Sequence, residues 1–206
     1  TEDDNIAIGY NAMTTNTAGG TKNVAVGNYA LDAHTSGDDC VAVGYQAGTS
    51  NTTGSWNTVV GSEALRDNTT GASATAIGYN AMLTNTTGSN NTAVGKESLI
   101  TNTTAANHTA IGYYALKANT SGQQNTAVGS SAMVANTTGS QNVAVGYFAL
   151  DANTTANDNT AIGWQALTSN STGASNVGVG VNALGGATTG SQNIAIGDQA
   201  MNHQYN

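Results

Sequence analysis

Residues 124–146 read QNTAVGSSAMVANTTGSQNVAVG, and this stretch decides the fold because its two ends are nearly the same. The segment 125–129 (NTAVG) returns seventeen residues later as 142–146 (NVAVG). Tandem repeats of about 20 to 50 residues are typical of solenoid proteins, and a unit of this length lies just below that range. The repetition therefore predicts a stack of short, similar structural units.

The same unit recurs along the whole chain of 206 residues. A glycine that follows Val or Ile, called the repeat glycine below, marks each copy, and successive repeat glycines are 17 residues apart except for a first interval of 18. The consensus is N-[TV]-A-[VI]-G-x-x-A-[LM]-x-x-N-T-T-G-S-x. We expect a single repeat domain, 1–206, of twelve units with a one-residue loop insertion near 19–22. The repeat glycines are Gly9, Gly27, Gly44, Gly61, Gly78, Gly95, Gly112, Gly129, Gly146, Gly163, Gly180 and Gly197.

Each unit predicts a strand, a turn, a second segment x-x-A-[LM]-x-x and another turn. The second segment could be a short strand or one helical turn, and an extended or irregular segment is expected because the next turn is only three residues away. The T/V-A-V/I segment alternates bulky and small residues, as a strand with two different faces does, and Asn-Thr-Thr-Gly has the chemistry of turns. We therefore predict an all-β fold, a parallel β-roll or β-helix solenoid of twelve coils stacked about 4.8 Å apart. The Val/Ile and Leu/Met positions are expected to form two internal columns. The expected core residues of the first column are Val26, Val43, Val60, Ile77, Val94, Ile111, Val128, Val145 and Ile162.

One such coil is narrow, so burial inside it offsets only part of the conformational entropy lost on folding. A further buried surface is expected, and small side chains let another backbone approach closely. These considerations predict a homotrimer of parallel rods, with the face lined by Ala and Gly near the shared axis.

The composition excludes several classes of partner. The formal net charge is −8 with only four Lys and Arg residues, so no basic surface is available for nucleic acid. No run of apolar residues is long enough for a membrane-spanning helix, so membrane insertion is not expected. The single cysteine, Cys40, excludes an intrachain disulfide.

At N-x-A-[VI]-G-x-x-A the sequence resembles the head repeats of trimeric autotransporter adhesins, which form a left-handed parallel β-roll trimer. The segments 5–9 (NIAIG), 23–27 (NVAVG) and 193–197 (NIAIG) carry this resemblance most closely. The form at 85–95 (NTTGSNNTAVG) is similar to repeats of bacteriophage tail fibres. Both resemblances imply an elongated homotrimer that contacts cell surfaces, located in a virion tail fibre or at the bacterial cell surface.

Exposed aromatic residues are the candidate ligand-binding groups. Tyr147, Phe148 and Trp164 follow repeat glycines of neighbouring units and could stack on sugar rings, although rings that merely shield the coil surface would give the same pattern. In odd-numbered units up to the ninth, Tyr follows the repeat glycine, which gives a 34-residue double unit. The stacked Thr and Asn positions offer either an array for carbohydrate or ice, or hydrogen bonds that hold the coils in register.

No catalytic or metal site is predicted. Glu63 and Glu97 occupy equivalent positions two units apart, but nothing in the sequence builds a cleft around them. His108 lacks the local spacing of a metal ligand set. We therefore expect no enzyme and no cofactor, but a trimeric fibre module, a shaft or receptor-binding region that binds host-surface glycans. The alternative is an ice-binding solenoid that uses the stacked Thr and Asn columns.

Overall fold

The structure, a computed structural model, describes residues 4–16 and 18–202. It comprises two compact units, Thr1–Ala106 (the N-terminal unit) and Asn107–Asn206 (the C-terminal unit). Each is a parallel β-solenoid with one three-residue strand per coil and no helix among the described residues, so the predicted fold class is confirmed. The N-terminal unit contains β1 (Ile6–Ile8), β2 (Val24–Val26), β3 (Val41–Val43), β4 (Thr58–Val60), β5 (Thr75–Ile77) and β6 (Thr92–Val94). The C-terminal unit contains β7 (Thr109–Ile111), β8 (Thr126–Val128), β9 (Val143–Val145), β10 (Thr160–Ile162), β11 (Val177–Val179) and β12 (Ile194–Ile196).

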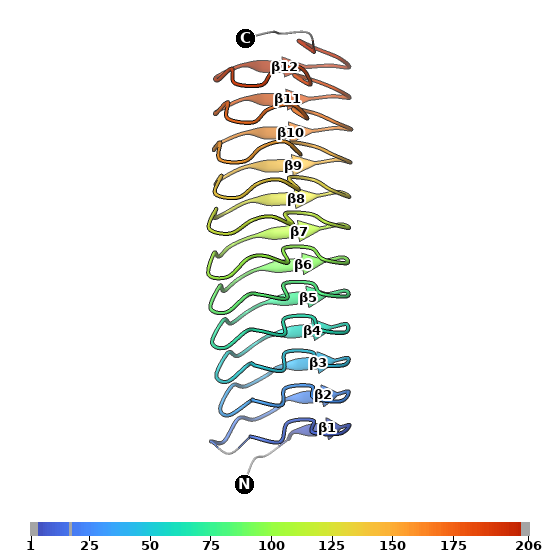
Figure 1. Ribbon diagram of the computed structural model, residues 1–206, viewed down its shortest axis with the longest axis vertical. Helices are drawn as coiled ribbons and strands as arrows, with labels where there is room; N and C mark the ends of the chain where they lie inside the picture. The colour runs from blue at the N-terminus through green and yellow to red at the C-terminus, as the bar shows by residue number, and fades with distance from the viewer. Residues whose placement is uncertain (1–3, 17, 203–206) are drawn as a thin grey trace. The chain divides into compact units, whose positions relative to one another are not determined.

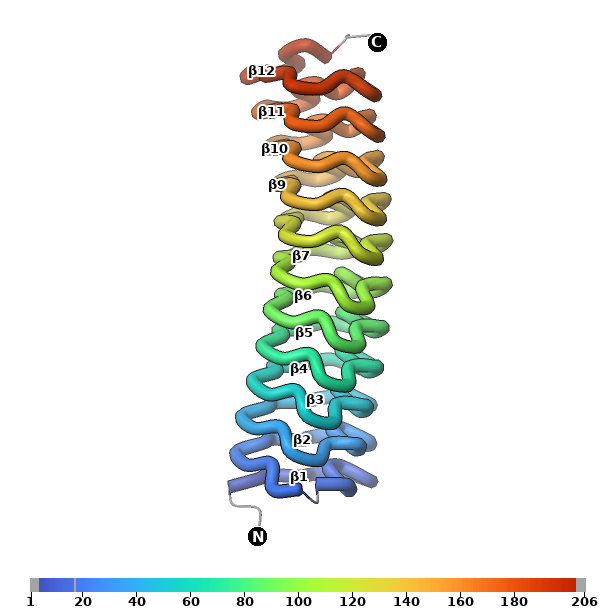
Figure 2. The backbone as a smooth tube through the Cα atoms, turned by 90° about the vertical axis from the view of Figure 1, so that its left-hand side faces the viewer, coloured from blue at the N-terminus to red at the C-terminus, as the bar shows by residue number. Residues whose placement is uncertain are grey.

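Neighbouring strands within each unit follow the order of the sequence and pair in parallel, as Figure 1 shows. Thr126 of β8 pairs with Val143 of β9, a shift of one 17-residue repeat. The pair Ile6 and Val24 differs by 18 residues, because the first coil carries the one-residue insertion. The register therefore places each residue beside its counterpart in the next coil. Figure 2 shows that the turns of successive coils in each unit also follow the same path.

The repeat glycine ends every strand because no other residue fits there. Gly129 has a φ of 140°, and a Cβ on it would lie 2.3 Å from the carbonyl oxygen of Gly146 in the next coil. This φ belongs to a region that side chains with a Cβ rarely occupy. The close approach lets successive coils stack with their backbones in contact.

The interior of each coil has an apolar half formed by alanine and by the larger side chains of leucine or methionine. In the eighth coil it contains Ala127, the middle residue of β8, together with Ala132 and Met133, all fully buried. The predicted internal column of Leu and Met is therefore confirmed. Its fully buried members are Leu31, Leu65, Met82, Leu99, Leu116, Met133, Leu150, Leu167 and Leu184.

The predicted internal column of Val and Ile is wrong, because these residues point outward. A three-residue strand turns only its middle side chain inward, and the Leu/Met column opposite leaves room there for little more than alanine. The alanine face predicted to lie near a trimer axis is thus the inside of the chain itself. Val43, Val60, Ile77, Ile111 and Ile162 are 36–40% exposed, and Val26, Val94, Val128 and Val145 are half-buried.

The other half of the interior is a pair of asparagine ladders. In the turn ladder, Asn85 Nδ2 donates to Asn68 Oδ1 at 3.0 Å and to the Gly88 carbonyl at 2.9 Å, while Asn85 Oδ1 accepts from Asn102 Nδ2 at 2.8 Å. The turn ladder consists of Asn51, Asn68, Asn85 and Asn102 in the N-terminal unit and Asn119, Asn136, Asn153 and Asn170 in the C-terminal unit.

The second ladder, the strand-entry ladder, lies just before the strands. Asn142 donates its backbone N–H to Asn125 Oδ1 at 3.0 Å and its Nδ2 to the Ala156 carbonyl at 2.8 Å. Each ladder thus binds a coil to its neighbour through buried amides, and the two together replace a second apolar layer. The strand-entry ladder consists of Asn23, Asn57 and Asn91 in the N-terminal unit and Asn125, Asn142, Asn159 and Asn176 in the C-terminal unit.

In the third coil a small residue, Gly48, stands where other coils have a large one, and in the fourth coil a larger residue, Val59, stands where other coils have alanine. Gly48 replaces the buried Leu or Met, and a Cβ on it would lie 3.2 Å from Leu31 Cδ2 and 3.9 Å from Val59 Cγ2. Val59 in turn replaces the buried alanine of β4 and is 1% exposed. The larger side chain at one position therefore compensates for the missing side chain at the other.

Candidate binding surfaces

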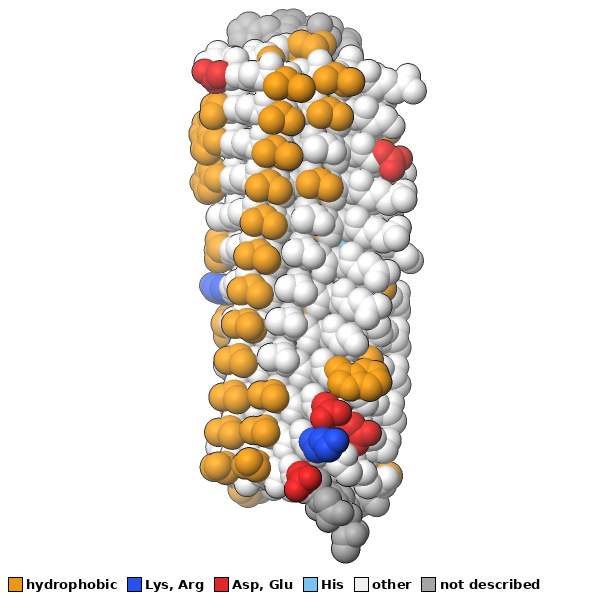
Figure 3. Space-filling model, turned by 180° about the vertical axis from the view of Figure 1, so that it is seen from behind, with side chains coloured by type: hydrophobic (Ala, Val, Ile, Leu, Met, Phe, Trp, Pro, Cys, Tyr) orange, Lys and Arg blue, Asp and Glu red, His pale blue; other side chains and the backbone are white. Residues whose placement is uncertain are grey.

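The outward side chains of the strands form a regular surface, called the strand face here, in each unit. It consists of the first and third residues of every strand, all of them Thr, Val or Ile, so it carries no charge. Figure 3 shows an apolar column beside a column in which only some side chains are apolar. The first strand position is Thr in six of the strands, and the third is always Val or Ile. A large exposed apolar patch marks an interaction site more often than chance. Strand propensity predicted these residues, but their outward direction was missed because the larger residues were expected inside.

Threonines of the strand face differ from those of the turns in their hydrogen bonds. In the turns, Thr69 Oγ1 donates to the Thr86 carbonyl at 3.0 Å, and Thr86 Oγ1 does the same to Thr103. On the strand face of the N-terminal unit, the hydroxyls of Thr58, Thr75 and Thr92 have no hydrogen-bond partner among the described residues. The strand-face hydroxyls are therefore available to a ligand or solvent, whereas these turn hydroxyls hold the coils together.

The three predicted ligand-binding residues lie on the C-terminal unit, where Tyr147 and Trp164 directly follow repeat glycines and Phe148 follows Tyr147. Tyr147 and Trp164 are 48% and 45% exposed in successive coils, and Phe148 is half-buried. The Tyr147 and Phe148 rings meet edge to face with centroids 4.4 Å apart. The backbone N–H of Gln165 donates to the Tyr147 carbonyl at 3.0 Å, so the segment that carries Trp164 is fixed to the coil below. The structure therefore brings Tyr147 and Phe148 into contact and places Trp164 one coil away.

A second group of aromatic residues lies on the N-terminal unit. The ring of Tyr29 lies between those of Tyr10 and Tyr45, at centroid distances of 5.5 and 6.2 Å, and meets both edge to face. Tyr79 follows two coils after Tyr45 and is similarly exposed. The N-terminal unit thus carries an aromatic surface of its own, with three exposed rings and the half-buried Tyr29.

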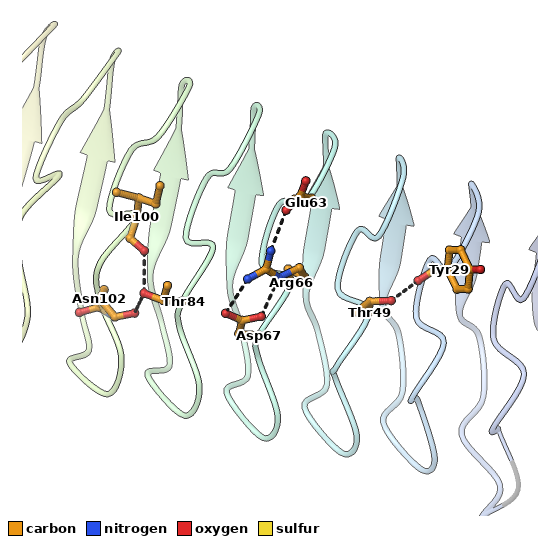
Figure 4. Close-up of polar contacts among 8 residues, drawn as sticks. All are labelled: Tyr29, Thr49, Glu63, Arg66, Asp67, Thr84, Ile100 and Asn102. Carbon is orange, nitrogen blue, oxygen red and sulfur yellow. Dashed lines mark hydrogen bonds and ion pairs between the residues drawn. The ribbon is translucent and has the colours of Figure 1, made fainter.

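The edge formed by the turns after the repeat glycine carries ion pairs. Figure 4 shows Arg66 between Glu63 and Asp67, with Nη1–Oε2 and Nε–Oδ1 distances of 2.7 Å. Hydrogen bonds to Asp67 and Glu63 raise the pKa of Arg66. Glu97 lies 3.7 Å from Lys96 Nζ. Both carboxylates considered for catalysis thus have a cationic neighbour.

The asparagine and histidine side chains considered as binding groups face the interior. The asparagines of both ladders are buried, so they present no amide array to a ligand. His108 takes an Asn place in the strand-entry ladder, where its Nδ1 accepts the Asn125 backbone N–H at 3.2 Å. Burial lowers the pKa of His108 to about 4, so the ring is neutral at pH 7. Among the described residues no group of three or more His, Cys, Asp or Glu side chains could hold a metal ion.

Within the described part of the chain, no helix has the length and apolar character needed to span a membrane. Comparison with protein-family models, with curated proteins and with solved structures finds no match for the chain.

Proposed function

We propose that the chain is a non-enzymatic fibre module that assembles as a homotrimer and contacts cell-surface carbohydrate, as a shaft or receptor-binding region of a tail fibre or bacterial adhesin. The observation that carries the proposal is the strand face, which is rich in Val and Ile, uncharged and uncovered in a single chain. Its location would be a virion or the bacterial cell surface, as the resemblance to tail-fibre and adhesin repeats implies.

A second and third copy are the partners that suit the strand face. Fully burying a Val or Ile side chain contributes about 1.5–3 kcal/mol, so covering the remaining 36–40% of each contributes about 0.5–1 kcal/mol. Six coils per unit then supply several kcal/mol from the third strand position alone. Parallel copies in register would place equivalent columns opposite one another, and no like charges would meet.

The solution mass tests the assembly. Light scattering of the full chain at micromolar concentration is expected to give three times the chain mass of 20.5 kDa. The variant V128K/V145K adds two charges to the strand face and should dissociate the trimer while circular dichroism stays unchanged. The matched variant T138K/T155K adds the same charges to exposed turn positions of the same coils and should remain trimeric. A monomeric parent chain would refute the proposal, and a trimeric V128K/V145K would exclude this face.

The carbohydrate part of the proposal rests on the exposed aromatic rings of Tyr147 and Trp164 with Phe148 beside them. Aromatic rings stack on the apolar faces of sugars, and they lose little conformational entropy on binding because they have few rotatable bonds. A glycan array probed with the parent chain should give signals that the variant Y147A/W164A loses. Retention of all signals in that variant would show that the glycan is bound elsewhere.

Ice binding is a second candidate function, favoured by the partner-free hydroxyls of Thr58, Thr75 and Thr92 beside an apolar column. The buried asparagines cannot take part, so this candidate is confined to the strand face. It requires a monomer with that face open to solvent. The test is thermal hysteresis of the parent chain, of T75K and of the control T70K, whose site is an exposed turn. Hysteresis that is lost in T75K and kept in T70K would favour ice binding over the fibre proposal. Absence of hysteresis in the parent chain would exclude ice binding.

A further inference from the structure

We propose that the tyrosines of alternate coils in the N-terminal unit, Tyr10, Tyr45 and Tyr79, form a ledge that binds a linear β-1,4-linked polysaccharide, with one disaccharide for every two coils. This inference rests on the proposed function, because it specifies the class of glycan that the module would contact. It concerns a different set of residues from Tyr147, Phe148 and Trp164.

The spacing of the ledge is set by the coil. Neighbouring strands lie about 4.8 Å apart, so equivalent residues two coils apart are separated by roughly 9.6 Å. Tyr10, Tyr45 and Tyr79 are 65%, 48% and 48% exposed. At this position the intervening coils carry the short polar residues Asn28 and Ser62. The second coil also carries Tyr29, the next residue along, whose half-buried ring lies edge to face between those of Tyr10 and Tyr45. The coil itself repeats every 17 residues, so packing does not require this alternation at an exposed position.

An extended β-1,4-linked chain has the matching symmetry. Successive sugars are turned by about half a revolution, so the same face of the pyranose ring returns at every second sugar, over a length close to two coils. If the tyrosine rings stack on every second sugar, the hydroxyls of the remaining sugars lie opposite the coils that carry no tyrosine at this position. Asn28 Oδ1 already accepts the Tyr10 backbone N–H at 3.0 Å, so only its Nδ2 is offered to a sugar hydroxyl, whereas Ser62 offers its hydroxyl. The amide side chains of Gln46 and Asn80 follow directly after Tyr45 and Tyr79.

Contacts around Tyr29 order the Tyr10 and Tyr45 end of the ledge before any ligand binds. The Tyr29 ring lies edge to face between the rings of Tyr10 and Tyr45. The Tyr29 backbone donates to the Tyr10 carbonyl at 2.8 Å, and its own carbonyl accepts from Thr49 Oγ1, as Figure 4 shows. Gln46 donates its N–H to the Asn28 carbonyl at 2.9 Å. A binding surface fixed in this way loses little entropy when it binds.

Beyond Tyr79 the pattern changes, since the next coil carries Lys96 at the equivalent position. Its Nζ lies 5.9 Å from the centroid of the Tyr79 ring, and a long cationic side chain replaces the short polar one. The ledge in this unit therefore comprises three rings with two gaps, which is room for about five sugars. Each ring alone would bind weakly, and the linked contacts would raise the affinity with chain length.

Titration calorimetry of the full chain with cello-oligosaccharides of two to six sugars tests the inference. Affinity should rise at least about tenfold from cellobiose to cellohexaose, and maltohexaose, which is α-linked and helically curved, should bind at least about tenfold more weakly than cellohexaose. Y45A and Y79A should each weaken cellohexaose binding about five- to tenfold, a range that corresponds to the loss of one aromatic contact. Y45F should bind normally, and so should W56A, which removes an exposed aromatic ring outside the ledge.

Absence of cellohexaose binding, affinity that does not change with length, or unchanged binding by Y45A and Y79A would each overturn the ledge. The proposed function is judged separately by the solution mass and by glycan signals lost in Y147A/W164A. A trimer that keeps those signals while failing the cellohexaose test would retain the proposed function and lose only this inference.

Discussion

The apolar half of the coil interior, lined by alanine and by leucine or methionine, tolerates exchange of volume between positions. The amide half, lined by the two asparagine ladders, depends on directed hydrogen bonds, and alanine takes an Asn place only at Ala74 and Ala187 among the described ladder positions. Gly48 and Val59 illustrate the first case, since one side chain fills the space that the other lacks. His34 illustrates the second, because its Nε2 lies 2.7 Å from the Gly37 carbonyl and its Nδ1 lies 3.2 Å from Asn51 Nδ2. Apolar packing depends mainly on volume, while hydrogen bonds also depend on direction.

The turn ladder also shows what happens when a member cannot form the bonds. Ala187 takes the Asn place that follows Asn170, and Asn170 Oδ1 then has no hydrogen-bond partner among the described residues. Asn153 Oδ1 also has no partner among the described residues, although Asn170 follows it, because Asn170 Nδ2 donates to the Gly173 carbonyl. Each unsatisfied buried acceptor costs about 1–3 kcal/mol. The cost favours asparagine in the coils where the ladder bond is formed, as between Asn68 and Asn85.

The largest effect should come from replacing one ladder amide by an acid of the same shape. Asn85→Asp removes the two donors that reach Asn68 Oδ1 and the Gly88 carbonyl and sets acceptors against acceptors. We expect the free energy of unfolding at pH 7 to fall by at least about 4 kcal/mol. The loss should be smaller at pH 3, because burial raises the carboxyl pKa and favours the protonated acid. Urea unfolding of N85D at both pH values measures this.

The control for N85D is Gln141→Glu, the same amide-to-acid change at an exposed position, which should alter stability by no more than about 0.5 kcal/mol. Equal destabilisation by the two variants would contradict the distinction between the two halves.

His108 offers a pH-dependent test of the amide half. The folded protein holds the neutral ring, with a pKa of about 4 compared with 6.5 in the unfolded chain. The unfolded chain therefore binds a proton at higher pH than the folded one, so stability falls as the pH drops from about 6.5 to about 4 and is not lost further below that. The shift corresponds to about 3 kcal/mol.

Protonation would place a donor on Nδ1, opposite the Asn125 backbone N–H. His108→Asn restores the usual ladder residue and should lack this part of the acid sensitivity, while changes due to carboxylates remain in both proteins. Unfolding curves of the parent and H108N between pH 4 and 7 compare the two. Parallel pH profiles would contradict the assignment.

A substitution in the apolar half should lower the free energy of unfolding less than N85D does, and a second substitution should restore most of the loss. Val59→Ala opens a cavity beside Gly48 and should lower the free energy of unfolding by about 2 kcal/mol. Adding Gly48→Leu restores the consensus pair, and the backbone permits it because Leu31 and Leu65 adopt a similar positive φ at equivalent positions. The double variant G48L/V59A should recover most of the loss in thermal unfolding. Additive destabilisation by the two changes would show that the positions do not share one space.

The sequence predicted the fold class from the spacing of the repeat glycines, because a strict period fixes the register of stacked coils. It also predicted the buried Leu/Met column, since Met133 and Leu150 recur on the same side of the unit. It assigned Val128 and Val145 to the wrong side, because hydrophobicity favours burial of the larger residue and the width of the interior was not known. The ligand-binding assignment of Tyr147, Phe148 and Trp164 stays a prediction, since exposure shows only that the rings are available.

The turn ladder also restricts which host cells can produce the folded protein. Its eight asparagines, from Asn51 to Asn170, each begin an Asn-x-Ser/Thr acceptor sequence for N-linked glycosylation, and all eight side chains are buried against the next coil. In a eukaryotic secretory pathway the glycan is attached while the chain is still unfolded, and the ladder has no space for it. Secretion by a eukaryotic host should therefore give misfolded chains, whereas a bacterial host would leave the amides free to pair.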